Sequence, residues 1–320
     1  MIYSRIVGTG SYLPEKILTN FELEKMVETS DEWIRDRTGI ARRHIAADGE
    51  TTVDLAEHAA RRALEMAQVS PADVDFIAFG TTTPDLVFPN CGVLLQDRLG
   101  CRGCAAFSVE TACSGYLYAL SIADKYVRAG EAKRALVIGA ETLSRITDWT
   151  DRGTAILFAD GAGATLLEPA AEPGIYSTHL HADGAYKDML YCGSGVSRGF
   201  NKDRTLAISM VGSEVFKVAV NTLTKSVDEA LTAHGFDRSA IDWLVPHQAN
   251  LRIIQAIAKR LELPMERVVV TVQDQGNTSA ASVPMALDIA VRDGRIKRGG
   301  RVLLEAFGGG FTWGSALVRF

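Results

Sequence analysis

Apolar residues of this chain gather in short unbroken runs instead of alternating with polar ones. The clearest runs are DFIAFG at 75–80, RALVIGA at 134–140, DWLVPH at 242–247 and RVLLEAF at 301–307. Runs of this kind are typical of strands in sheets that are covered on both faces. The pattern therefore predicts an α/β fold in which helices are layered between sheets.

The pattern occurs twice along the chain. Residues 61–83 align without gaps on residues 228–250, and each segment reads as an amphipathic helix, a polar turn and a buried strand. Residues 113–141 similarly match residues 277–308. Each copy thus contains helix, strand, helix and strand, which predicts two duplicated α/β halves.

We expect these copies to form an N-terminal half over residues 1–170 and a C-terminal half over residues 171–320. Gly130 and Gly294 follow the second helix of each copy. Because glycine adopts the left-handed conformation at low cost, it commonly ends a helix. The two helices are therefore predicted to end at these glycines.

Composition narrows the range of functions. The chain has 320 residues, of which 47% are hydrophobic and 23% charged, as in an ordinary globular protein. A net charge of -5 provides no overall basic field for nucleic acid. No apolar run approaches the ~18 residues of a membrane span, and the first residues do not read as a secretory signal. We expect a cytoplasmic protein without nucleic-acid or membrane partners.

The cysteines are odd in number and irregularly spaced, which argues against a disulfide framework and for a reducing compartment. They are Cys91, Cys101, Cys104, Cys113 and Cys192. Cys101 and Cys104 have CxxC spacing, but no second pair follows at the distance of a zinc site. His179 and His181, on one face of a strand, are interpreted as structural. No metal site is expected.

Cys113 stands where a predicted strand, AFSVETA, gives way to an apolar helix. A thiol at a helix start faces unpaired N–H groups and the positive end of the helix dipole, both of which favour the thiolate. Its small neighbours would let a substrate approach. A free cysteine is nevertheless more often a buried structural residue, so position alone leaves both interpretations open.

Two further polar residues also stand at the end of a predicted strand or the start of a predicted helix. His247 ends a buried strand, Asn277 begins a helix, and the aligned repeats place Cys113 opposite Asn277. The order Cys, His, Asn also occurs in papain-like hydrolases. That alternative fits poorly, because Cys113 is followed by Ser-Gly-Tyr and the papain fold is not a tandem duplication.

Across its whole length the sequence resembles the thiolase superfamily, and within it the β-ketoacyl-acyl carrier protein synthase III family. The motifs that carry the resemblance are GTGSYLP, TSDEWIRDRTGI, DRGTAILFADGAGA, VPHQANLRII, GNTSAASVPMALD and EAFGGGFTWGSALVRF. The resemblance implies a thiolase-like fold of duplicated α/β halves in a five-layer α-β-α-β-α arrangement. It also implies decarboxylative condensation of an acyl-CoA with malonyl-acyl carrier protein, and the acyl-CoA that it implies is acetyl-CoA. The product, 3-oxoacyl-acyl carrier protein, would initiate fatty-acid synthesis without a metal or redox cofactor.

The resemblance assigns roles to individual residues. Cys113 would attack the thioester, and the backbone N–H groups of Cys113 and Gly309 would bind the oxyanion. His247 and Asn277 would donate hydrogen bonds to the enolate that forms when the malonyl group loses carbon dioxide. The residues implied for CoA and its pantetheine arm are Trp33, Arg37, Arg152, Leu157, Met210, Gly212, Phe216 and Ala249.

Two partner surfaces are also implied. The family arrangement is a homodimer in which Phe88 closes the acyl pocket of the partner. In the predicted helix NLRIIQAIAKRL, three basic residues are seven and eight positions apart and so share one face. We expect this face, together with a lysine nearby, to dock the acidic carrier protein. The docking residues are Lys217, Arg252, Lys259 and Arg260.

Some positions depart from the family pattern. Glu110 and Thr111 replace small apolar residues, and a carboxylate turned toward Cys113 would raise its pKa. Ser213 replaces an asparagine that helps to hold the pantetheine, and residues 187–204 are expected to form a surface loop. The alternative functions are a related synthase that uses longer acyl-CoA starters, a cysteine acyl-CoA hydrolase, and an acyl-binding module without catalysis.

Overall fold

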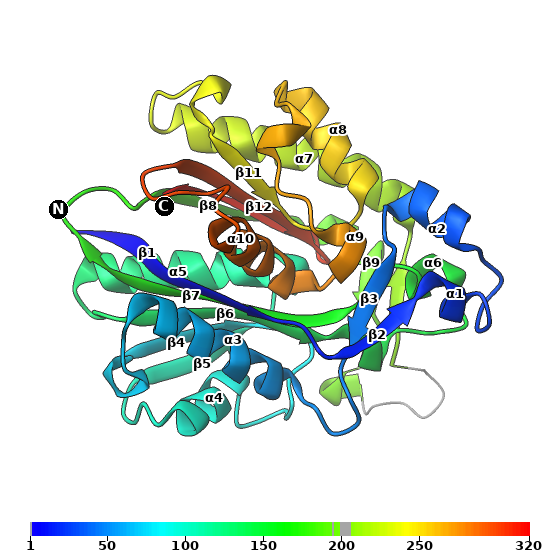
Figure 1. The fold of residues 1–320 in the computed structure, drawn as a ribbon, viewed down its shortest axis with the longest axis horizontal. Helices are drawn as coiled ribbons and strands as arrows, with labels where there is room; N and C mark the ends of the chain where they lie inside the picture. The colour runs from blue at the N-terminus through cyan, green and yellow to red at the C-terminus, as the bar shows by residue number, and fades with distance from the viewer. Residues whose placement is uncertain (1, 194, 199–205) are drawn as a thin grey trace.

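A five-stranded sheet forms the core of the first half of the protein (Figure 1). The structure is a computed structural model that describes residues 2–193, 195–198 and 206–320. The strand order is β1-β7-β6-β4-β5, with β4 parallel to β5 and β6, and with β7 antiparallel to β6 and β1. The strands are β1 (Tyr3–Tyr12), β4 (Phe76–Gly80), β5 (Ala105–Val109), β6 (Ala135–Thr142) and β7 (Asp160–Ala170).

A second sheet repeats this arrangement with four strands in the order β11-β12-β13-β8. Here one parallel pair, β11 with β12, is followed by two antiparallel pairings, just as two antiparallel pairings follow the parallel pairs of the first sheet. The strands are β8 (Ile175–Ala182), β11 (Trp243–Pro246), β12 (Arg301–Gly308) and β13 (Thr312–Arg319). The expected duplication is therefore confirmed at the level of the sheets.

Helices separate and cover the two sheets, giving the expected order α-β-α-β-α (Figure 1). Helices α3 (Thr52–Ala67) and α4 (Cys91–Leu99) cover the outer face of the first sheet. Helices α5 (Gly115–Ala129) and α10 (Ser282–Arg292) lie between the sheets, and α7 (Gly212–Thr232) and α8 (Leu251–Leu261) form the opposite outer layer. The five-layer fold class is confirmed.

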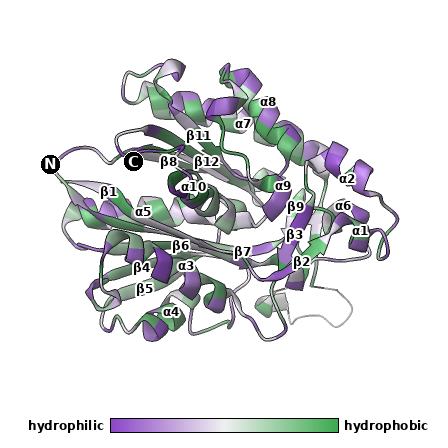
Figure 2. Cartoon of the chain, in the orientation of Figure 1, coloured by the Kyte–Doolittle hydropathy of each residue, from purple (hydrophilic) through white to green (hydrophobic). Residues whose placement is uncertain are grey.

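Burial explains the unbroken apolar runs. Every residue of β4 and β6 is buried, as expected for strands with helices on both faces. The helices differ in the same way according to their burial. Figure 2 shows that α10, between the sheets, is hydrophobic, while the outer helices α8 and α2 (Asp31–Thr38) carry hydrophilic residues. Removing apolar surface from water, at about 25 cal/mol per Å², holds the layers together.

The helix ends follow the prediction. Gly130 and Gly294 both have φ of 81°, the left-handed conformation that ends α5 and closes the segment after α10. Short 3-10 turns precede both central helices, and each turn opens on a non-glycine residue with positive φ, Ala112 at 46° and Ser279 at 48°. The segment from Ser279 to Gly294 is three residues shorter than the one from Ala112 to Gly130.

This difference corrects the predicted repeat alignment. Matching the two turns places Cys113 opposite Ala280, and not opposite Asn277. The helix ends alone suggested the wrong register because the shorter copy lacks nearly one helical turn, about 3.6 residues. Asn277 instead precedes its turn.

Smaller elements gather at one end of the layers, beside α8 and α7 (Figure 1). Strands β2 (Lys16–Thr19) and β3 (Arg42–Ile45) pair with each other, as do β9 (Leu190–Cys192) and β10 (Ile208–Met210). The short helices are α1 (Asn20–Leu23), α6 (Arg152–Ala155) and α9 (Val272–Gln275). The 3-10 turns are η1 (Pro71–Asp73), η2 (Ala112–Ser114), η3 (Leu143–Ile146), η4 (Gly184–Tyr186), η5 (Val196–Arg198), η6 (Arg238–Ala240), η7 (Met265–Arg267) and η8 (Ser279–Ala281).

The segment 187–204 differs from the expected surface loop, because its described part contains β9 and η5. Residues 194 and 199–204 lie outside the described part of the chain. The division into halves at residue 170 stays a prediction, since α10 of the second half packs against β1 and β7 of the first. In the ranges that the structure describes, no helix has the length and apolar character to cross a bilayer.

Candidate active site

Cys113 lies in η2, the turn that connects β5 to α5. The end of β12 approaches this turn so closely that a Cβ atom at Gly308 would lie 2.6 Å from the Cys113 nitrogen. Glycine is therefore required at position 308 for the second sheet to reach the cysteine. Only 7% of Cys113 is exposed.

The thiol of Cys113 is enclosed by protein, which opposes the thiolate that the helix start favours. Burial raises the pKa of Cys113 to about 12, while contact with the Ser279 hydroxyl lowers it and the Glu141 carboxylate raises it. Loss of water disfavours the charged form of any group. The carboxylate of Glu110, suspected from the sequence, is exposed.

His247 is the residue that follows β11, and its side chain is also buried. Its N–H donates to the Glu305 carbonyl at 2.8 Å, and its Nδ1 lies 2.6 Å from the Ser282 hydroxyl. Because Ser282 Oγ also accepts from the Gln248 N–H at 3.3 Å, its own proton is available to Nδ1. This network assigns the imidazole proton to Nε2. Burial lowers the pKa of His247 to about 3, so the ring is neutral.

Asn277 is fixed through its backbone and its side chain. Its N–H donates to the Leu157 carbonyl, and its carbonyl accepts from the Ala159 N–H, both at 2.9 Å. The side-chain oxygen accepts from the Ser279 N–H at 2.9 Å. The amide nitrogen Nδ2 is thereby directed away from this turn as a donor.

One short segment joins the three predicted residues. Ser279 hydrogen-bonds to Asn277 and lowers the pKa of Cys113, and Ser282, at the start of α10, hydrogen-bonds to His247. The structure therefore brings Cys113, His247 and Asn277 together around residues 279–282. The repeat alignment that first paired Cys113 with Asn277 was out of register, but both residues lie at this segment.

The glycine loop after β12 is tied to the nucleophile turn. The Thr312 hydroxyl donates to the Thr111 carbonyl at 3.0 Å and accepts from the Ser114 hydroxyl at 2.8 Å. The Gly309 carbonyl lies 3.2 Å from the same Thr312 oxygen. Gly309 is thus held beside Cys113, as an oxyanion-binding role requires.

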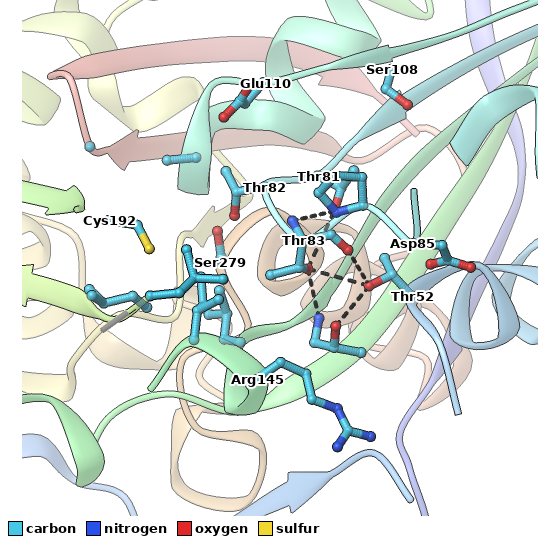
Figure 3. Close-up of a pocket in the computed structure, with 18 of the residues that line it drawn as sticks. Thr52, Thr81, Thr82, Thr83, Asp85, Ser108, Glu110, Arg145, Cys192 and Ser279 are labelled. Atoms are coloured by element: carbon cyan, nitrogen blue, oxygen red, sulfur yellow. Dashed lines mark hydrogen bonds between the residues drawn. The ribbon is translucent and has the colours of Figure 1, made fainter. Parts of the chain in front are cut away.

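A cavity of about 1270 Å³ opens over this turn. Cys113, Ser279 and Gly309 line it, and Figure 3 shows Ser279 close to Thr82 at its wall. Glu110 also lines the cavity. A cavity of this size that reaches a buried cysteine suits a small organic substrate.

The predicted CoA residues divide into an aromatic cluster and an apolar one. The Arg152 and Arg37 guanidinium groups lie 4.9 Å and 5.5 Å from the centre of the Trp33 ring. Leu157 belongs to a buried apolar cluster against which both Met210 and Trp33 pack. Gly212 begins α7 beside Met210, Phe216 is partly exposed one turn later, and Ala249 is half-buried two residues after His247. Ser213 is exposed in the first turn of α7.

Helix α8 presents the predicted basic face. Arg252, Lys259 and Arg260 are exposed, while Ile257 and Leu261 on another face are buried. Two of these charges have partners within the chain: Arg252 pairs with Asp36 at 2.8 Å, and Arg260 donates to Asn221. Lys217 pairs with Glu214 at 2.8 Å.

Phe88 ends an exposed apolar stretch. Leu86, Val87 and Phe88 are 49%, 66% and 83% exposed, in the connection between β4 and α4. Contiguous exposed apolar residues mark interaction surfaces.

The other motifs show no site. Cys91, Cys101, Cys104 and Cys113 are free thiols. His179 and His181 both contact Glu229, at 3.4 Å and 2.7 Å. Among described residues no group of three or more His, Cys, Asp or Glu side chains is arranged to hold a metal.

Sequence reasoning missed three residues of this site, Glu141, Ser279 and Ser282. Glu141 had a signal, because a carboxylate that directly follows an unbroken apolar run continues a buried strand and needs hydrogen-bond partners there. The serines stand within GNTSAAS, but their contacts with residues far away in sequence leave no local pattern.

Solved structures share both this fold and its whole extent. A 3-oxoacyl-[acyl-carrier-protein] synthase III from Aquifex aeolicus is 45% identical, with a TM-score of 0.94 over 99% of this chain and 100% of that one. A β-ketoacyl-[acyl carrier protein] synthase III from Thermus thermophilus is 43% identical, with a TM-score of 0.93 over 99% of both chains. Fold and site define a thiolase-like condensing acyltransferase.

Sequence comparison gives the family. Residues 107–184 match 3-oxoacyl-[acyl-carrier-protein (ACP)] synthase III, and residues 231–320 match the C-terminal part of that family. A β-ketoacyl-[acyl-carrier-protein] synthase III of Thioalkalivibrio sulfidiphilus is 62% identical over 100% of both chains. The chain belongs to the β-ketoacyl-acyl carrier protein synthase III family.

Proposed function

We propose that this enzyme condenses an acyl-CoA, principally acetyl-CoA, with malonyl-acyl carrier protein to start fatty-acid synthesis. The observation that carries the proposal is the meeting of Cys113, His247 and Asn277 around one turn. The names of the relatives support the carrier-protein product.

In the first half-reaction the Cys113 sulfur attacks the thioester carbonyl. A new carbon–sulfur bond forms, and negative charge develops on the carbonyl oxygen. The N–H groups of Cys113 and Gly309 are the donors proposed to stabilise it, because preorganised donors cost no reorganisation during the reaction. The bond to CoA then breaks, and the acyl group remains on Cys113.

In the second half-reaction the malonyl group loses carbon dioxide. The electron pair that remains is shared with the thioester oxygen, where His247 Nε2–H and Asn277 Nδ2–H are proposed to donate. A neutral imidazole suits this task, since it donates a hydrogen bond without surrendering its proton. The carbanion attacks the acyl group and expels the Cys113 sulfur. No metal or redox cofactor is proposed, because the thioester itself stabilises the carbanion.

The remaining partners are proposed as follows. Trp33 and Arg152 would hold adenine between their planar groups, and Arg37 would bind phosphate, since guanidinium groups suit both tasks. The exposed stretch ending at Phe88 supports a homodimer. The free thiols of Cys91, Cys101, Cys104 and Cys113 support a reducing, cytoplasmic location.

The test is a product assay with purified protein, a panel of acyl-CoAs and malonyl-acyl carrier protein. Mass spectrometry of the carrier protein should detect the 3-oxoacyl product, and the panel reports starter length. A cysteine hydrolase would instead release free acid without carrier protein. An acyl-binding module would bind CoA thioesters and leave them intact.

A further inference from the structure

Glu141 is a buried carboxylate at the active site that the steps above do not use. It lies on β6 and has no exposed surface. The hydroxyls of Thr81, Thr82, Thr83 and Ser279, together with the Thr82 N–H, donate to it over 2.6–3.2 Å. Such a ring of donors is what a buried carboxylate requires.

Ser279 connects this carboxylate to the nucleophile. Its hydroxyl lies 3.1 Å from Glu141 Oε1, and Ser279 lines the same cavity as Cys113, whose pKa it lowers. A hydroxyl has one donor and two acceptor sites, so it can donate to Glu141 while accepting from the Cys113 thiol. Positive φ at Ser279 and its N–H bond to Asn277 fix the backbone that presents this hydroxyl.

The thiol must lose its proton to attack, and two groups compete to take it. His247 is a poor acceptor, because burial lowers its pKa to about 3 and Ser282 occupies its Nδ1. Burial acts on Glu141 in the opposite direction and raises its pKa, against the donors around it. Glu141 is therefore the stronger base of the two.

We propose that Glu141, acting through the Ser279 hydroxyl, accepts the Cys113 proton during acylation and returns it during condensation. This inference rests on the proposed function. As the carbon–sulfur bond forms, the thiol proton passes to Ser279 Oγ, and the Ser279 proton passes to Glu141 Oε1. The CoA thiolate leaves and takes a proton from water. When condensation expels the Cys113 thiolate, the two transfers run in reverse, and Cys113 and Glu141 regain their starting forms.

If Glu141 acts only as a neighbouring negative charge, its substitution should change Cys113 reactivity in the opposite direction. Its charge raises the pKa of the two thiols that it faces, Cys113 and Cys91. If it were only a neighbouring charge, Glu141→Gln would lower the pKa of Cys113 and speed its reactions. If it accepts the proton, the same substitution slows them.

The experiment measures Cys113 reactivity from pH 6 to 9 in two ways, by alkylation with iodoacetamide and by acylation with acetyl-CoA. The parent rate should reach a plateau as Glu141 ionises. Glu141→Gln and Ser279→Ala should each lose about 10²-fold or more at pH 7, the size of a typical general-base effect. Their rates should rise in proportion to hydroxide, with no plateau. An equal or faster rate in Glu141→Gln would overturn the proposal.

Two comparisons separate this result from misfolding and from failure of the proposed function. The double variant should be no slower than the slower single variant, because residues that act as a unit are not additive. Asp160→Asn is the matched control. Asp160 is a buried carboxyl on the neighbouring strand β7, where it accepts a hydrogen bond from the Ser144 hydroxyl, and loss of its charge should leave the pH profile unchanged.

If acetyl-CoA fails to acylate the parent, the proposed function is wrong, while alkylation still tests Glu141. A plateau in Ser279→Ala would overturn the relay even if Glu141→Gln does not fold.

Discussion

Cys113 and His247 are both enclosed by protein, and burial shifts their pKa values in opposite directions, to about 12 and about 3. Each shift favours the neutral form, because desolvation disfavours charge. The site therefore rests as a thiol beside a neutral imidazole. Its polarity is supplied by fixed donors, which suits a reaction in which charge develops and disappears on the substrate.

This arrangement predicts separate effects on the two half-reactions. His247→Ala and Asn277→Ala should still take an acetyl group onto Cys113, because their donors serve the enolate and not the first attack. Condensation should fall by about 10²-fold or more for one missing donor. Single-turnover acylation and condensation rates, measured separately, check this. Failure of both variants at acylation would assign the pair to thiol activation instead.

Glu305 predicts a pH-dependent stability. It is fully buried on β12, burial raises its pKa to about 8, and neither carboxylate oxygen has a hydrogen-bond partner. Because its folded pKa lies above its ordinary value of 4.5, its favourable contribution is complete below pH 4.5 and is lost as pH rises through 8.

Glu305→Gln should therefore unfold at a higher temperature than the parent at pH 9, by an amount equivalent to a few kcal/mol, and at a similar temperature at pH 4.5. Thermal unfolding at both pH values measures the difference. Exposed Glu65→Gln is the control. A variant that is less stable than the parent at pH 9 would show that Glu305 has a charged-state partner.

Among the secondary-structure elements, the strands were the easiest to predict. The four apolar runs became β4, β6, β11 and β12, because burial on both faces leaves a local mark on the sequence. Turn η8 was not predicted in its correct register. The repeats were aligned by the residues that they share at the helix C-termini, and such an alignment does not reveal that one helix is shorter at its start. Glu141 lies 138 positions from Ser279, and only the fold reveals such a contact.

Helix α8 carries the docking prediction. Its Arg252 pairs with Asp36 on α2, the helix that also carries Trp33. Arg252→Glu should raise the KM for malonyl-acyl carrier protein strongly and weaken its salt dependence, while acylation from acetyl-CoA stays near normal. Steady-state kinetics at several salt concentrations check this.

Asp36→Asn separates docking from support of α2. It removes the ion pair, which is exposed and so contributes at most ~1 kcal/mol, but keeps the Arg252 charge. Its KM for the carrier protein should stay near the parent value. A matching rise in KM, or equal loss in both half-reactions of Arg252→Glu, would place Arg252 with CoA or the fold.

At the scale of the whole molecule, the contiguous apolar residues Leu86–Phe88 are exposed, as residues of a protein interface are before the partner binds. We predict that it is covered in a homodimer, with Phe88 reaching the acyl pocket of the second copy. Phe88→Ala should then shift preference toward longer acyl-CoAs. Acylation across a chain-length panel measures this, with Phe21→Ala, exposed on α1, as the control. A monomer by light scattering, or an unchanged profile, would contradict the prediction.

The central claim is that Cys113 holds the acyl group covalently between the two half-reactions, at a site to which both halves of the protein contribute. Intact mass spectrometry of the enzyme tests it most directly, first after acetyl-CoA and then after malonyl-acyl carrier protein. We predict one acetyl adduct that is absent from Cys113→Ala and that disappears on addition of the second substrate as 3-oxoacyl-carrier protein forms. An adduct that persists in Cys113→Ala, or one that is lost to free acetate without the carrier protein, would contradict the account.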